Sequence, residues 1–72
     1  MTQAERVKKY IVDFGGITAA EAASELGIMY LSGRIRDLRN AGEQIAAVPR
    51  ISKNRYGDDV RYHEYRFPMG AR

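Results

Sequence analysis

The sequence contains no cysteine and a single histidine, His63. The lack of cysteine excludes disulfide bonds and thiolate metal ligands, and one histidine cannot build a multi-histidine metal centre. No apolar run approaches the roughly 20 residues that a membrane-spanning helix needs. The polar, mixed-charge residues 1–9 also lack the apolar stretch of a secretory signal peptide. These absences predict a cytoplasmic protein with no cofactor, no metal ion and no membrane partner.

The chain is short, at 72 residues. A chain of this length forms one domain at most, and few such chains build a buried catalytic pocket. We therefore expect a single domain over residues 1–72, with its core in residues 3–67 and a flexible tail at 68–72. We also expect that the protein is not an enzyme, because the sequence contains no recognisable catalytic constellation.

Positive charge is unevenly distributed along the chain. The formal net charge is +3, from 12 Lys or Arg and 9 Asp or Glu. Residues 34–55 hold six Lys or Arg against two Asp or Glu, a net of +4, whereas residues 1–33 sum to −1 and residues 56–72 to zero. Binding to nucleic-acid phosphates needs a concentrated basic surface of this kind. The clustering favours a nucleic-acid interface over an ordinary solvated face of mixed charges.

Two capping boxes mark the starts of two helices. In each, a Thr precedes a Glu by three residues, at Thr2–Glu5 and at Thr18–Glu21, so that side chains satisfy exposed backbone N–H groups. The first helix is expected over residues 3–14, before a Gly-Gly pair, and the second is a short alanine-rich helix that ends at about Leu26. An inner apolar stripe of the first helix is formed by Val7, Tyr10, Ile11 and Phe14.

A third helix is expected from about Met29 or Tyr30 to Asn40. Its inner stripe consists of Leu31, Ile35 and Leu38, which recur at helical spacing. Gly27 separates this helix from the second one, and Gly42 lies just beyond its end. The chain therefore carries two short helices joined by a tight turn.

The hydrophobic period changes to that of a strand after the third helix. Ile45, Ala47 and Ile51 alternate with polar or small residues, which predicts a half-buried strand. Pro49 has no N–H group, so this strand is expected at a sheet edge or a bulge. A second strand is expected over residues 60–67. Ile17, between the first two helices, is expected to form no more than a bridge of strand.

The polar stretch between the two strands predicts a turn, so that together they form a hairpin. The order of elements is then helix, helix, helix, strand, strand. This order predicts an α+β, mostly α fold: a winged helix-turn-helix of three helices followed by a two-stranded β-hairpin wing.

The same residues resemble the small winged helix-turn-helix proteins common in phages and prophages. The resemblance is carried by the Leu26-Gly27-Ile28 turn, by the Arg34-Ile35-x-Asp37-Leu38-Arg39 run, and by the Lys53-Asn54-Arg55-Tyr56-Gly57 segment. It covers about residues 3–67 and implies DNA binding, usually as a transcriptional or accessory regulator. One departure is Met29, where the family often has a Thr or Ser suited to capping the third helix. Met cannot accept hydrogen bonds from the first N–H groups of a helix.

In a helix-turn-helix, the second helix of the pair lies in the major groove, so residues 29–40 are the expected recognition helix. The wing, at about residues 52–60, is expected on the DNA backbone or in the minor groove. Arg pairs with guanine through two hydrogen bonds, and Ser and Tyr donate to bases or phosphates. The predicted DNA-contacting residues are Tyr30, Ser32, Gly33, Arg34, Arg36, Arg39, Lys53, Asn54 and Arg55. For Arg34 and Arg36, the alternative is a solvated face with local pairs to Asp37 or Glu43.

Gly33 is expected on the outermost line of the third helix, away from the core. A glycine inside a helix costs about 1 kcal/mol relative to alanine. Its missing side chain favours a close approach of the backbone to DNA or to a partner. A tolerated defect and tight packing of a neighbouring protomer are the alternatives.

Three functions fit these observations. The first is a double-stranded DNA-binding regulator of phage or prophage transcription in the bacterial cytoplasm. The second is a winged helix that binds a host or phage protein, because Met29, Tyr30 and Gly33 form a less polar helix surface. The third is an excisionase-like accessory factor that bends DNA. A homodimer stays open as well, since regulators often read two half-sites. Two copies could associate through helix 3–14, through the edge of the hairpin or through the DNA itself.

Overall fold

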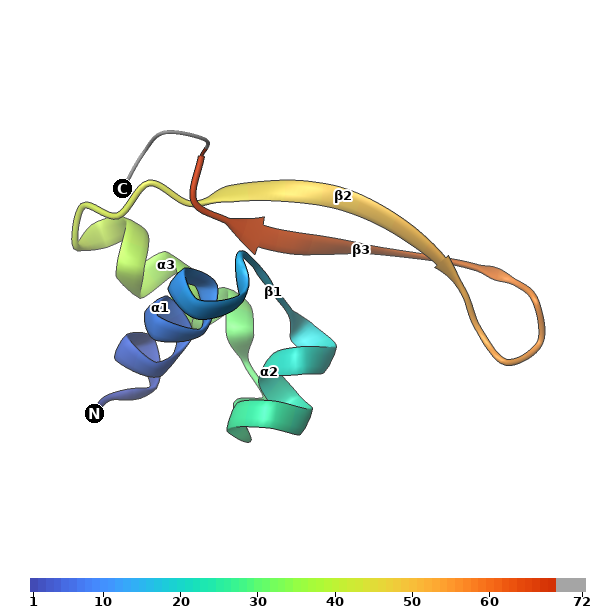
Figure 1. The fold of residues 1–72 in the computed structure, drawn as a ribbon, viewed down its shortest axis with the longest axis horizontal. Helices are drawn as coiled ribbons and strands as arrows, with labels where there is room; N and C mark the ends of the chain where they lie inside the picture. Colours follow the sequence, from blue (N-terminus) through green and yellow to red (C-terminus); the bar gives the residue numbers. More distant parts are fainter. Residues whose placement is uncertain (69–72) are drawn as a thin grey trace.

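The computed structural model describes residues 1–68, which form a body of three helices and a long, projecting β-hairpin (Figure 1). The predicted tail at residues 68–72 lies, except for residue 68, outside the described residues. The elements in chain order are α1 (Gln3–Phe14), β1 (Ile17–Thr18), α2 (Ala19–Leu26), α3 (Leu31–Asn40), β2 (Ala46–Lys53) and β3 (Asp59–Arg66).

Both predicted capping boxes form. The Glu5 N–H donates to Thr2 Oγ1 at 3.1 Å, and the Thr2 N–H donates to Glu5 Oε1 at 2.7 Å. The second box repeats this exchange between Thr18 and Glu21, at 3.2 and 2.9 Å. Gly27 ends α2 with a φ of 68°, a left-handed conformation that glycine adopts without a steric penalty. The predicted bounds of the first two helices are confirmed.

The third helix begins one residue after the later of its two predicted starts. Tyr30 is the residue before its first turn, and no side chain caps the helix there. The capping position is therefore Tyr30, so the expectation that placed it at Met29 is wrong by one residue. The predicted end at Asn40 is confirmed.

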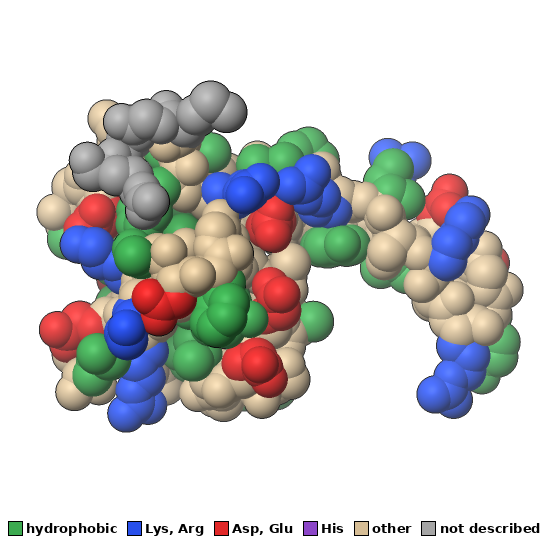
Figure 2. All heavy atoms as spheres, in the orientation of Figure 1, with side chains coloured by type: hydrophobic (Ala, Val, Ile, Leu, Met, Phe, Trp, Pro, Cys, Tyr) green, Lys and Arg blue, Asp and Glu red, His purple; other side chains and the backbone are tan. Residues whose placement is uncertain are grey.

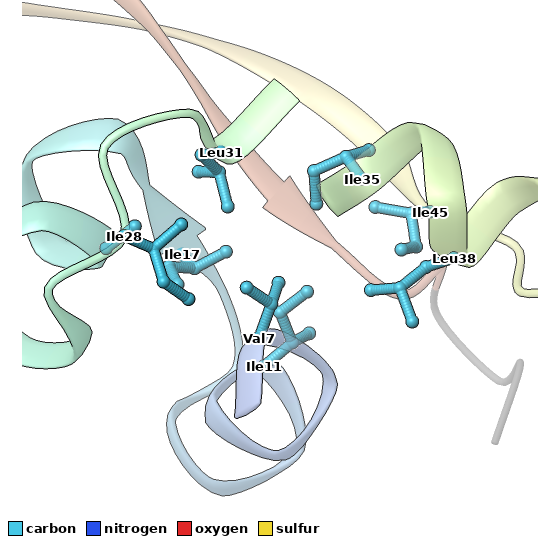
Figure 3. Packing of buried hydrophobic residues seen from close by; sticks show 9 residues of the cluster. Val7, Ile11, Ile17, Ile28, Leu31, Ile35, Leu38 and Ile45 are labelled. Carbon is cyan, nitrogen blue, oxygen red and sulfur yellow. The ribbon is translucent and has the colours of Figure 1, made fainter. Parts of the chain in front are cut away.

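A single apolar core joins the three helices to the start of the sheet. Its side chains point toward one another between α1, α3 and β1 (Figure 3). The buried residues are Val7, Ile11, Ile17, Ala22, Ile28, Leu31, Ile35, Leu38 and Ile45. The predicted inner stripe of α3 is confirmed in full. The stripe of α1 is only partly right, because Phe14, on its last turn, is 72 % exposed.

The sheet has three antiparallel strands in the order β1-β3-β2. The prediction of a two-stranded hairpin is therefore wrong in strand number, since Ile17 pairs with Tyr65 and Thr18 with Glu64. A strand of two residues is too short to show an alternating pattern, which explains the error. The placement of Pro49 on an edge strand is confirmed, because β2 has a neighbour on one side only.

The predicted inner face of β2 is wrong. Ile45 is buried but precedes the strand, and from Ala46 onward the half-buried residues are Ala46, Val48 and Arg50. Ile51 is 60 % exposed. The outer half of the hairpin extends beyond the helices, so neither of its faces meets the core (Figure 1).

Candidate nucleic-acid interface

The exposed face of α3 presents Ser32 and Arg36. Helix α1 packs against α3 from the core side, and in Figure 1 α3 lies behind α1. Ser32 and Arg36 are four residues apart and therefore share one face of the helix. Both are exposed. Within residues 1–68, Arg36 has no ion-pair partner. The alternative prediction, a local ion pair of Arg36 with Asp37 or Glu43, is thus not found among the described residues.

Arg34 and Arg39, on the same helix, form hydrogen bonds with other groups of the protein. Arg34 Nε donates to Asp37 Oδ2 at 3.0 Å, and its Nη1 donates to the Gln3 side chain of α1 at 3.1 Å. Arg39 Nε and Nη2 both donate to the carbonyl of Ile45, at 3.2 and 2.8 Å. The Arg39 guanidinium also lies 6.0 Å from the centre of the Tyr65 ring. Arg34 therefore joins α3 to α1, and Arg39 joins α3 to the chain leading into β2.

The turn of the hairpin is ordered by Asn54. Its Oδ1 atom accepts hydrogen bonds from the backbone N–H groups of Tyr56 and Asp58, at 2.9 and 3.0 Å. Such local bonds fix the path of a turn. Lys53, just before it, forms an ion pair with Asp59 across the hairpin. Two of the predicted wing contacts thus have structural partners within the hairpin.

Arg55 lies at the tip of the same turn. It is exposed, and the described part of the chain offers it no ion pair. The neighbouring Tyr56 is 82 % exposed. Every residue from 51 to 63 is exposed, so the tip extends into solvent well away from the core.

A family model described as a winged helix-turn-helix domain matches residues 2–68. The chain belongs to this family. No curated protein and no solved structure gives a significant match. In a winged helix-turn-helix domain, α2 and α3 form the helix-turn-helix pair, α3 is the recognition helix, and the β2–β3 hairpin is the wing. Membership of the family suggests that DNA is the partner.

The structure corrects the predicted environment of Gly33 on the recognition helix. Gly33 is buried rather than outermost, because the Tyr30 ring covers it. A Cβ atom added at Gly33 would lie 2.5 Å from Tyr30 Cε2, closer than real contacts allow. The missing side chain therefore makes room for Tyr30, which is itself 58 % exposed at the start of the helix. Gly33 does not offer bare backbone to an incoming molecule.

The base of the wing is held by contacts that sequence reasoning missed. Arg66 Nε donates to the carbonyl of Gly15 at 2.9 Å, which joins β3 to the helical body, and Arg50 Nη2 lies 2.8 Å from Glu64 Oε1, which joins β2 to β3 within the wing. A Cβ atom added at Gly16 would lie 2.8 Å from the Glu64 side chain, so a larger residue there would require that side chain to shift. The only sequence signal was the Gly-Gly pair, which served as a helix stop. These contacts become visible only once β1 is paired with β3.

The described residues were also compared with the patterns of a metal site and of a membrane-spanning helix. Residues 1–68 contain no group of three or more His, Asp or Glu arranged to hold a metal ion. No helix in the same range is long and apolar enough to cross a membrane.

Proposed function

We propose that the protein binds double-stranded DNA through the recognition helix and the wing. The proposal is supported by the cations of the basic block, residues 34–55. Four of its six cations have a partner within the protein: Arg34, Arg39, Arg50 and Lys53, although the pair of Lys53 with Asp59 is exposed and therefore weak. The two cations for which residues 1–68 offer no partner are Arg36 on α3 and Arg55 at the wing tip. Helix α3 thus presents Arg36, and the wing presents Arg55 together with Arg61 of β3, which lies outside the block and is also exposed without an ion pair in residues 1–68.

The two arginines are proposed to have different tasks. Arg36, with Ser32 beside it, lies where a recognition helix meets base edges, and a bidentate Arg–guanine pair is worth about 1–3 kcal/mol of discrimination. Arg55 lies on a loop tip, where it reaches phosphates or a narrow minor groove with more negative potential. Arg36 would therefore contribute specificity, and Arg55 would contribute affinity for any sequence.

The biological role we propose is regulation of phage or prophage transcription in the bacterial cytoplasm. The resemblance to small phage and prophage winged helices supports this role. An excisionase-like factor would make the same contacts and differ by bending its site. Gel mobility of fragments carrying the site at different positions separates the two roles, because a bent site changes mobility with its position.

The test begins with selection of binding duplexes from a random pool, followed by fluorescence anisotropy at several salt concentrations. On the selected duplex, Arg36→Ala should weaken binding about 5- to 150-fold, which corresponds to about 1–3 kcal/mol. On an unrelated duplex the loss should be small. Lys8→Ala, on α1, removes one positive charge that is already paired with Glu43, and it should leave binding nearly unchanged. If no duplex is bound even at low salt, the proposal is wrong.

A second candidate function, protein binding, is favoured by the surface at the start of α3. Met29 is 85 % exposed and Tyr30 is 58 % exposed, so two large side chains of low polarity adjoin in sequence before the recognition helix. Gly33 no longer supports this candidate, because Tyr30 covers it. A pull-down that recovers a stoichiometric protein, and loses it with Met29→Ser, would favour this function if duplex binding is absent.

A further inference from the structure

Helix α1 carries a second surface that neither the core nor the recognition helix uses. Phe14 is 72 % exposed, and its ring centre lies 4.6 Å from that of Tyr10. These rings and Leu26 of α2 line one shallow hollow of about 200 Å³, together with Met1, Arg6, Lys9 and Asp13. Apolar surface rimmed by charged residues is typical of a contact site for another protein.

Two of the three charged residues around this hollow, Arg6 and Asp13, are complementary to those of a second copy, and the third, Lys9, is 62 % exposed. Arg6 and Asp13 are seven residues apart, so they lie on one side of the helix, separated by about 10 Å along its axis. If two α1 helices lie antiparallel about a twofold axis between residues 9 and 10, Arg6 of one copy faces the partner's Asp13. The symmetry creates this ion pair twice. The same arrangement brings Phe14 against the N-terminal turn of the other copy.

Both charged groups are available for such a contact. Arg6 is exposed, and residues 1–68 contain no ion-pair partner for it. Asp13 lies 3.1 Å from Lys9, in a pair whose side chains are 62 % (Lys9) and 42 % (Asp13) exposed. An exposed pair of this kind is worth little, so Asp13 can exchange it for another partner at small cost.

The surface lies away from the proposed DNA interface. In Figure 2, hydrophobic side chains gather over the region of α1, with basic and acidic side chains around them. Helix α3 lies behind α1 in this orientation (Figure 1). A contact through α1 therefore leaves Ser32 and Arg36 exposed.

We propose that this surface, formed by Arg6, Tyr10, Asp13 and Phe14, pairs two copies of the chain through antiparallel α1 helices. The dimer presents two recognition helices related by a twofold axis, which matches the symmetry of a palindromic DNA site. The proposal does not depend on DNA binding, because association is measured on the protein alone.

The first test is sedimentation velocity of the protein without DNA over a series of concentrations. A reversible monomer–dimer equilibrium is expected, and Phe14→Ser should weaken it at least 10-fold. Val12→Ser is the matched control, because Val12 is 48 % exposed on a different face of α1 and should have no effect. A protein that stays monomeric up to millimolar concentration, or an equal effect of the two substitutions, overturns the proposal.

The second test reverses the charges. Arg6→Asp and Asp13→Arg should each weaken self-association, because each places like charges opposite one another. An equimolar mixture of the two variants should dimerise again, since the mixed dimer restores both opposite-charge pairs. Circular dichroism of each variant verifies folding. If the mixture associates no better than either variant alone, the antiparallel α1 arrangement is wrong. Anisotropy with duplex DNA, measured separately, reports on the proposed function and not on this surface.

Discussion

The helical body and the wing differ in what stabilises them. The body holds all nine buried apolar residues of the described chain, whereas every residue from 51 to 63 in the wing is exposed. Packing stabilises the body. The outer wing depends instead on the strand pairing of β2 with β3, on the turn bonds of Asn54 and on the Lys53–Asp59 pair. The comparison indicates that the proposed DNA contacts of the wing can be changed with little effect on stability, whereas those of α3 lie on the body that the core stabilises.

The largest expected effect is loss of the core. Ile35 is 1 % exposed, and Ile35→Ala should lower the free energy of unfolding by about 2–5 kcal/mol, because it leaves a cavity between the helices. Ile51 in the wing is 60 % exposed, and Ile51→Ala should change the same quantity by less than about 0.5 kcal/mol. Urea unfolding measures both. Equal losses of unfolding free energy in the two variants would contradict the difference in packing between body and wing.

A smaller effect is expected at the edge of the body, where Tyr30 covers Gly33. Gly33→Ala should destabilise the protein by about 1–3 kcal/mol, because the new methyl group must displace the ring. In a Tyr30→Ala background the same change should stabilise it by up to about 1 kcal/mol, because alanine favours the helix. A double-mutant cycle from thermal or urea unfolding measures this reversal. The same sign in both backgrounds would show that the ring does not decide the cost.

The wing should respond in binding but not in stability. Arg55→Ala is expected to leave the free energy of unfolding within about 0.5 kcal/mol of the original. It should weaken binding to all duplexes alike and reduce the slope of log affinity against log salt by about 1. Anisotropy on the selected and an unrelated duplex measures both quantities. A loss confined to the selected duplex would instead give Arg55 a role in reading bases.

The smallest effect concerns the start of the body and its dependence on pH. The hydrogen bond from the Thr2 backbone holds the pKa of Glu5 below its ordinary value of 4.5. Because the folded pKa is the lower one, this stabilisation is present above about pH 4.5 and is lost as pH falls through the folded pKa. The difference in melting temperature between the protein and Glu5→Gln should therefore shrink as the pH falls below that value. A difference that stays constant down to pH 3 would contradict it.

The helices could be predicted because their signals are local. Each capping box couples residues three apart, and the inner stripe of α3 repeats within one helix. At Ile17 only a bridge of strand was predicted, and its place as a third strand beside β3 was missed, because the partner Tyr65 is far along the chain and two residues carry no period. Gly33 was misplaced because nothing in the sequence indicates that the Tyr30 ring folds back over it. The face of β2 was wrong because alternation presumes a core beside the strand, and the outer hairpin has none.

For the candidate site, the sequence pointed to elements rather than to side chains. The basic block, residues 34–55, runs from α3 through β2 into the turn of the wing. Which cations are held inside the protein depends on partners from other elements, such as Gln3 for Arg34 and the Ile45 carbonyl for Arg39. No spacing rule reveals such partners. The DNA contacts of Ser32, Arg36 and Arg55 stay predictions until they are measured.

The pairing of β1 with β3 over only two residues has a mechanical consequence. Near Tyr65 the sheet is three strands wide and is tied to the body by Arg66 and Gly15. Beyond this point it continues as a two-stranded ribbon, and such ribbons twist more readily than wider sheets. The hairpin is therefore fixed to the body at its base, and its outer part can bend and twist more easily than the base. We expect the tip of the hairpin to adapt to the local width of a DNA groove while its fixed base keeps the recognition helix in place.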